Sequence, residues 1–154
     1  MELGHATVGL VPYLRIPLLG LAALVGVLGL VQRPAGAADV YSTGAVEARV
    51  RSSLHLRAHE RAPIDIEVRN TSGIPCDLLV TLSPEYVDSF RDVAMIPEPS
   101  DRWSVLLENV APGEERLVAL ELEAGTPGPR HGEVRIRSGR GQDLTIPLRT
   151  FVAP

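Results

Sequence analysis

Histidines are the residues with which this chain could most readily bind a metal ion or move a proton. His55 and His59 stand four residues apart in HLRAHE, and His131 lies much further along the chain. Two imidazoles at this spacing share one face of a helix, but the neighbouring apolar residues repeat every two positions, which indicates a strand and a loop. The order also differs from His-Glu-x-x-His, in which the glutamate acts as a base. We expect solvated histidines on a strand edge, with a metal site at these three residues as the alternative.

Carboxylates near Asp88 are the second candidate for chemistry. Glu85, Asp88 and Asp92 fall on one side of a short predicted helix, and Asp101 follows it. Paired carboxylates hydrolyse glycosidic bonds, and carboxylates bind calcium, although calcium loops alternate their acids around a glycine and this segment does not. A solvated acidic surface is the simpler interpretation. A metal-handling or hydrolytic envelope protein, using the histidines or these acids, is therefore kept only as the alternative function.

Nucleophilic catalysis has no support in the sequence. No serine stands in a Gly-x-Ser-x-Gly motif, and Cys76 has no base near it in the sequence. As the only cysteine of the chain, Cys76 rules out an intramolecular disulfide and a cysteine-based zinc site. It shares the apolar phase of Leu78 and Val80, so we expect a buried and unreactive thiol. The sequence thus predicts a protein that is not an enzyme and needs no cofactor.

The charge of the chain argues against nucleic acid as a partner. All 15 basic residues are arginines, and they are scattered among 19 acids. After residue 37 the chain has 18 acids, all but Glu2, and 13 arginines, all but Arg15 and Arg33, so the net charge of this part is −5. The sequence contains no basic stretch that would follow a phosphate backbone.

The N-terminal 37 residues have the composition of a targeting segment. Ile16 to Val31 form an uncharged apolar run of 16 residues behind Arg15, and the small residues Ala35-Gly36-Ala37 follow. Such a run spans about 24 Å as a helix, less than a hydrocarbon core of about 30 Å, which favours a cleaved signal peptide. An uncleaved single-pass transmembrane anchor is the alternative, because apolar residues also precede Arg15. Both predict that the rest is extracytoplasmic, either secreted or periplasmic or membrane-anchored, with residues 38–45 as a linker.

Residues 46–154 alternate apolar and polar side chains in short runs separated by turns, which predicts β-strands. The clearest run, Pro63 to Leu82, reads as a hairpin with a tight turn at Asn70 to Gly73. Further runs give seven or eight strands, with one or two helical turns from about Pro84 to Asp92. The expected class is all-β, an Ig-like antiparallel Greek-key sandwich with one short helical insert, preceded by an N-terminal hydrophobic helix; a small barrel is the rival. The expected core contains Ile66, Val68, Val80, Leu120, Leu122, Val134, Ile136 and Ile146.

Two segments, IDIEVRNTSGIPCDLLVTL and VLLENVAPGEERLVALELEAGTPGPRHGEVRI, carry a resemblance to a known group. A strand, the turn at Asn70 to Gly73 and a second strand are followed by Pro112-Gly113-Glu114, a strand, Pro127-Gly128 and another strand. Over roughly Val46 to Val152 this order resembles the Ig-like modules of bacterial secreted and membrane proteins, the broad group of NEW3 and CARDB-type domains. The resemblance implies a non-catalytic accessory or adhesion-like module and brings no functional residues with it.

Aromatic residues gather in the irregular segment from Pro84 to Trp103. The chain has one Trp, three Tyr and two Phe, and Tyr86, Phe90 and Trp103 lie here together with Met95. Because aromatic side chains anchor interfaces well, we predict that these four residues form a partner-binding surface. In the alternative, Tyr86 and Phe90 plug one end of the sandwich and Trp103 belongs to the core.

The function that fits all these features is a non-catalytic binding or structural module outside the cytoplasm, the external domain of a membrane-associated complex. Its expected partner is another envelope or membrane protein. The N-terminal segment would also contact the membrane if it is retained.

Overall fold

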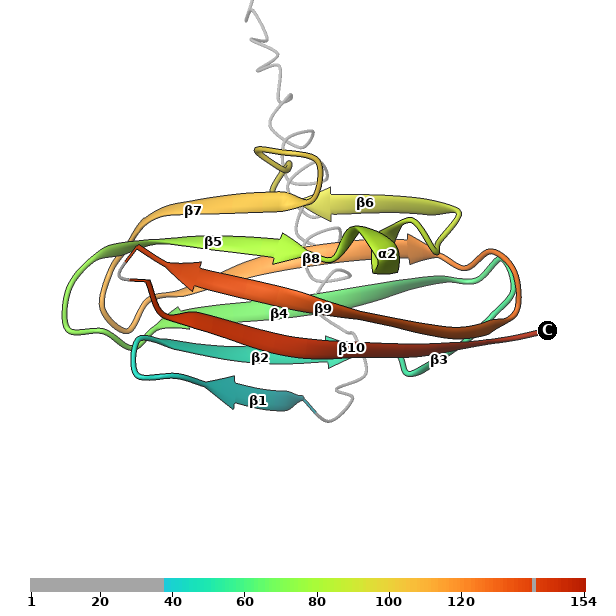
Figure 1. The fold of residues 1–154 in the computed structure, drawn as a ribbon, viewed down its shortest axis with the longest axis horizontal. Coiled ribbons are helices and arrows are strands. Elements are labelled where there is room, and N and C mark those ends of the chain that lie inside the picture. Colours follow the sequence, from blue (N-terminus) through green and yellow to red (C-terminus); the bar gives the residue numbers. More distant parts are fainter. Residues whose placement is uncertain (1–37, 140) are drawn as a thin grey trace, which may run out of the picture. The chain divides into compact units, whose positions relative to one another are not determined.

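A computed structural model describes residues 38–139 and 141–154, which form two packed β-sheets (Figure 1). The predicted targeting segment, 1–37, lies outside the described residues. Sheet A has the strand order β1-β2-β4-β8-β6 and sheet B the order β3-β10-β9-β5-β7. No helix among the described residues is long and apolar enough to span a membrane. The elements are β1 (Asp39–Ser42), β2 (Val46–Ser52), β3 (His55–Arg57), β4 (Arg61–Asn70), β5 (Cys76–Leu82), α2 (Pro84–Val87), β6 (Asp92–Ile96), β7 (Ser104–Val110), β8 (Glu115–Glu123), β9 (Gly128–Ser138) and β10 (Asp143–Ala153).

Alternating side chains of the two sheets meet in one apolar core. In β4, for example, Ile64 and Ile66 are buried while Asp65 between them faces outward, as the two-residue period of a strand requires. All eight residues predicted for the core are buried, and none is more than 1% exposed. Cys76 differs from the prediction because it is only partly buried: it is the first residue of β5, and the pairing with β7 shifts between Cys76 and Leu78.

The strand order is that of an immunoglobulin-like sandwich with additions. β2-β4-β8-β6 corresponds to the A-B-E-D sheet of a constant-type domain, and β10-β9-β5 to its G-F-C sheet. The described residues form ten strands where seven or eight were predicted. Part of the difference lies at residues 39–42, predicted as linker, which pair with β2 as β1. The sandwich is also not wholly antiparallel, since β3 runs parallel to β10.

The hairpin predicted around Asn70 is wrong. β4 and β5 belong to different sheets, so the turn between them is a corner of the sandwich. The buried Asn70 side chain holds this corner: its Nδ2 donates to the carbonyls of Ile74 at 2.9 Å and Val110 at 2.8 Å. Its Oδ1 accepts from the backbone N–H of Ser72 at 2.9 Å and from the Ser72 hydroxyl at 2.6 Å. Because Val110 ends β7, Asn70 ties the β4–β5 corner to the β7–β8 corner.

The strands β6, β9 and β10 complete the two sheets, and the helix α2 differs from the prediction. β6 forms an edge of sheet A beside β8, and β9 and β10 form a hairpin in which Arg137 lies opposite Asp143. The helix is shorter than predicted, because α2 ends at Val87 and Phe90 lies beyond it.

Candidate functional site

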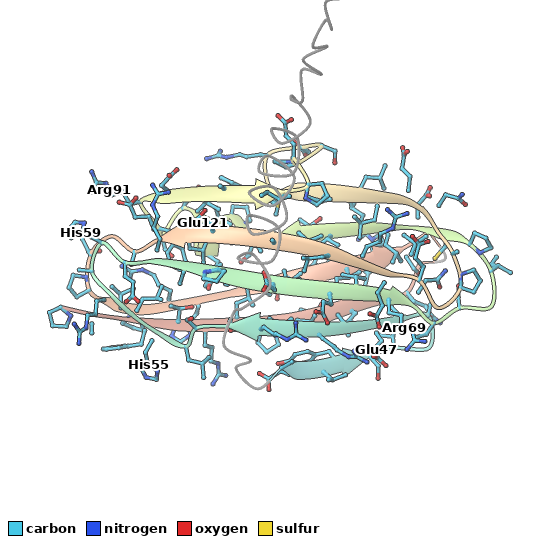
Figure 2. All side chains as sticks on the ribbon, turned by 180° about the vertical axis from the view of Figure 1, so that it is seen from behind. Glu47, His55, His59, Arg69, Arg91 and Glu121 are labelled. Atoms are coloured by element: carbon cyan, nitrogen blue, oxygen red, sulfur yellow. The ribbon has the colours of Figure 1, made fainter. Side chains whose placement is uncertain are left out.

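The candidate histidines lie at separate places in the fold. His55 is on β3, where its ring meets that of Phe151 edge to face with 6.3 Å between centroids. His131 is on β9, opposite Arg149. His59 occupies the turn between β3 and β4, and Figure 2 shows it beside Arg91 with His55 away from both. Within residues 38–139 and 141–154, no three His, Cys, Asp or Glu side chains lie close enough to hold one metal ion.

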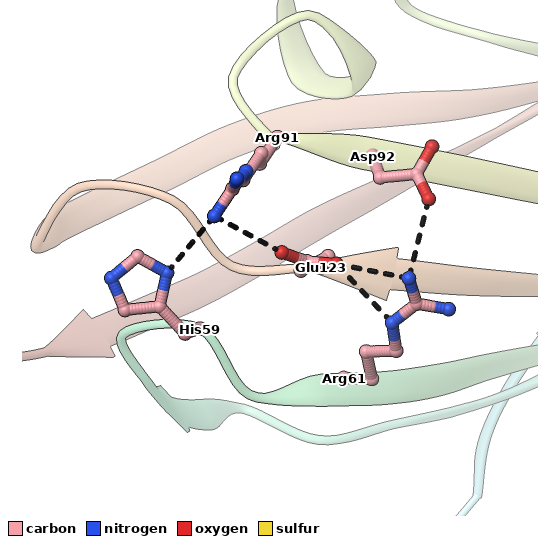
Figure 3. A network of polar contacts seen from close by, with 5 residues as sticks. All are labelled: His59, Arg61, Arg91, Asp92 and Glu123. Carbon is pink, nitrogen blue, oxygen red and sulfur yellow. Dashed lines mark hydrogen bonds and ion pairs between the residues drawn. The ribbon is translucent and has the colours of Figure 1, made fainter.

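His59 belongs to a network of charged side chains at one end of β8 (Figure 3). Glu123 accepts from Nε and Nη2 of Arg61 at 3.2 and 3.0 Å, and its Oε1 lies 3.6 Å from Nη1 of Arg91. The same Arg91 nitrogen lies 3.4 Å from His59 Nδ1, and Arg61 Nη2 lies 3.5 Å from Asp92. Exposed pairs of this kind contribute at most about 1 kcal/mol each. Their effect is to fasten the ends of β4, β6 and β8 to the β3–β4 turn.

The candidate acids are divided among different partners. Asp88 Oδ1 lies 3.4 Å from Nη2 of Arg102, whereas Asp92 belongs to the network around Glu123. Glu85 lines a groove on the outer face of sheet B. Asp101 Oδ1 accepts the backbone N–H of Arg102 at 2.7 Å, so each of Asp88, Asp92 and Asp101 has its own partner.

The four residues predicted to contact a partner lie in or against the core. Tyr86, Phe90 and Met95 are 0%, 8% and 8% exposed, and Trp103 is partly buried against the same cluster. The rings of Tyr86 and Phe90 meet edge to face with 5.1 Å between centroids. This burial favours the alternative, in which the rings fill one end of the sandwich, and the contact of these residues with a partner stays a prediction.

Tyr86 is inserted against β9 at Gly132. A Cβ atom on Gly132 would lie 2.2 Å from the Cβ of Tyr86, so only glycine leaves room for the ring. The Tyr86 hydroxyl shares a hydrogen bond of 2.8 Å with Oγ1 of Thr150, and both groups are buried. Burial raises the pKa of Tyr86, while the hydrogen bond with Thr150 acts in the opposite direction with a smaller effect.

A groove of about 340 Å³ lies on the outer face of sheet B, where β5 leads into α2. We call it the α2 groove. Its volume is at the lower end of the range found for binding pockets. The Ser83 hydroxyl accepts the Glu133 backbone N–H at 3.0 Å, which fixes the start of α2 against β9 and thereby fixes the wall of the groove. The groove is lined by Leu79, Thr81, Leu82, Ser83, Pro84, Glu85, Glu133, Arg135 and Arg137.

The charged lining of the α2 groove consists of two arginines of β9 and two glutamates, Glu85 and Glu133. Arg135 Nη2 donates to Glu133 at 2.9 Å, and Arg137 donates through Nε and Nη2 to both oxygens of Asp143, at 3.1 and 3.3 Å. The hydrogen bond and the charge of Asp143 raise the pKa of Arg137. A guanidinium has five N–H donors, so both arginines keep donors for carbonyl or carboxylate groups of a ligand. The partly buried Leu79 adds an apolar contact, and the groove is thus equipped for binding.

Sequence reasoning missed the α2 groove. The sequence does show which residues of β5 and β9 face outward, because Thr81, Arg135 and Arg137 alternate with apolar residues that are buried. The pairing that brings these residues together, with Thr81 opposite Arg135 and Leu79 opposite Arg137, joins strands more than 50 positions apart and left no local signal.

No protein family and no curated protein matches this sequence. Among solved structures, a FixG-related protein from Vibrio parahaemolyticus is 10% identical, with 73% of this chain and 100% of that chain covered and a TM-score of 0.49. The CARDB domain of the PF1109 protein from Pyrococcus furiosus is 12% identical, with 75% and 89% covered and a TM-score of 0.45. The PapD-like domain 7 of human CEP192 is 15% identical, with 80% and 95% covered and a TM-score of 0.41. These are similarities of fold alone.

Proposed function

We propose that this domain is a non-catalytic binding or structural module that contacts another envelope or membrane protein through the α2 groove. The observation that carries the proposal is the groove itself, a hollow in a sheet face that combines the partly buried Leu79 with the guanidinium groups of Arg135 and Arg137. Arginine beside apolar surface is typical of protein interfaces. The order of strands and turns, which resembles that of NEW3 and CARDB-type modules, supports the same role.

The proposed place of action is outside the cytoplasm. The support is the apolar run from Ile16 to Val31 behind Arg15, which has the length and composition of an export signal or a single anchor. Alkaline phosphatase fused after Pro154 tests this, because the enzyme is active only when exported. Fluorescence from a reporter that matures only in the cytoplasm would contradict the proposal.

Site-specific photo-crosslinking tests the groove. A photoreactive amino acid replaces Arg135 in the groove or, as the control, Arg116 on β8; the two side chains are similarly exposed, at 51% and 49%. We expect a discrete adduct with one envelope protein from position 135 only. Thr81→Trp, which fills the groove, should abolish that adduct. Equal adducts from both positions, or an adduct that survives Thr81→Trp, would show that the groove is not the contact site.

A further inference from the structure

One edge of sheet B is largely open. β9 pairs with β10 along residues 143–152, but β3 covers the opposite side of β10 only at Phe151, Val152 and Ala153. Figure 1 shows β3 beside the C-terminal end of β10 alone. Among the described residues, the stretch from Asp143 to Thr150 therefore has no strand on this side, and its outward backbone groups are free to pair with one.

The hydrogen bonds between β10 and the β3 side show which backbone groups of β10 face the open edge. Phe151 donates its N–H to the carbonyl of Leu54, on the β3 side, at 2.8 Å. Backbone groups of successive residues point to opposite sides of a strand, so Thr145 and Arg149 turn both N–H and carbonyl toward the open edge. Pro147 has the same phase but offers a carbonyl only, and an edge is the place in a sheet that tolerates proline.

A cleft of about 230 Å³ lies beside this edge, between β1 and β2 of sheet A and β10 of sheet B. A strand added to β10 would send alternate side chains into this cleft. Val50 and Leu148 are apolar and buried, and Leu54 is 57% exposed, so the cleft suits apolar side chains. Asp39 disfavours a carboxylate on the β1 side of the cleft, whereas the exposed Arg149 lines it on the β10 side. The cleft is lined by Asp39, Tyr41, Val50, Ser52, Leu54, Pro147, Leu148 and Arg149.

Exposed arginines that form no ion pair lie along the same edge. Eight of the described arginines form ion pairs. Within the part of the chain that the structure describes, the guanidinium groups of Arg149 and of Arg57 on β3 form no ion pair, and both residues are exposed; the Arg57 backbone N–H donates to Glu60 Oε2 at 2.7 Å. His131, on β9, lies opposite Arg149. Phe151 follows two residues after Arg149, pairs with β3 and is 46% exposed. The complementary ligand carries carboxylates on its outward side.

We propose that the open edge of β10 binds an extended segment of a partner protein in which apolar and acidic residues alternate. The segment adds as a strand beside residues 143–149, bonds to the backbone of Thr145 and Arg149, places its apolar side chains in the cleft and its carboxylates near Arg149. This surface is distinct from the α2 groove and does not depend on it.

The test uses the full ¹⁵N-labelled chain in detergent micelles and the probe peptide acetyl-Glu-Val-Glu-Val-Glu-amide. Binding should protect the amides of Thr145 and Arg149 from hydrogen exchange. Thr145→Pro, which removes an edge donor, should abolish binding, whereas Thr145→Ala should retain it. Arg149→Ala should weaken binding about two- to fivefold, as expected for one exposed ion pair.

Controls separate this edge from other sites. The peptide with Lys in place of Glu should bind at least about fivefold more weakly, and Thr81→Trp in the α2 groove should leave the affinity of the original peptide unchanged. The proposal is overturned by absence of binding up to about 1 mM peptide. It is equally overturned if binding leaves the Thr145 amide unprotected, or if the Lys peptide binds as well as the Glu peptide.

Discussion

Replacing Asn70 with alanine should remove a substantial part of the stability of the domain. The side chain is fully buried and makes four hydrogen bonds, two from Nδ2 to the carbonyls of Ile74 and Val110 and two to Oδ1 from Ser72. At about 1 kcal/mol for each bond the loss is about 4 kcal/mol. Domains of this size are stable by about 5–15 kcal/mol, so the loss is between about a quarter and four fifths of the total.

Urea denaturation measures this effect, because Trp103 is the only tryptophan of the chain and packs partly buried against the core. Asn70→Asp should be at least as damaging as Asn70→Ala, since it keeps the acceptor for Ser72 but turns a carboxylate oxygen toward two carbonyls. Thr71→Ala is the matched control: it alters the next residue of the same corner, which is exposed, and should change stability by less than about 0.5 kcal/mol. A loss below about 1 kcal/mol for Asn70→Ala would refute the role of this side chain in holding the corner.

Three further predictions concern the core. Gly132→Ala should destabilise the domain by about 1–3 kcal/mol, because the new Cβ overlaps Tyr86, whereas Gly73→Ala, with no atom within 4 Å of the added Cβ, should be nearly neutral in thermal denaturation. Burial raises the pKa of the Tyr86 hydroxyl above 10.0. Above pH 10 the unfolded chain therefore loses this proton while the folded state keeps it. The free energy of unfolding should then fall by up to about 1.4 kcal/mol per pH unit. Tyr86→Phe should remove that part of the slope, and an unchanged slope would contradict the assignment. Leu120→Ala should cost about 2–5 kcal/mol in the same urea titration, and a loss below 1 kcal/mol would mean that its site collapses around the smaller residue.

The core could be predicted from the sequence because burial in a strand follows a local rule. Ile66 and Val68, or Leu120 and Leu122, alternate with polar residues, and a period of two fixes which of them face inward regardless of the neighbouring strand. The same rule fails at Cys76, where the strand begins and the register shifts.

Which strands pair with each other was harder to predict. Two strands joined by a turn show the same alternation whether they form a hairpin or belong to different sheets. The residues from Asn70 to Gly73 suit a hairpin turn, yet they form a corner between two sheets. The corner is held in part by the Nδ2 contact of Asn70 with Val110, 40 positions away, which a local pattern does not reveal. The α2 groove was missed for the same reason, since Leu79 and Arg137 meet only through long-range pairing.

Two single residues did carry tertiary information that the sequence analysis left unused. Pro147 interrupts the alternating run LTIPLRTF, and because proline cannot donate to a ladder, it marks β10 as a strand with an open side. Gly132 interrupts the run of β9 at an inward position, where glycine signals the close approach of another group, which the structure identifies as Tyr86. The glycine indicates that a group packs closely on β9 at this position, although only the structure shows that the group is Tyr86. The proline likewise indicates an open edge of β10, the edge for which we propose strand addition.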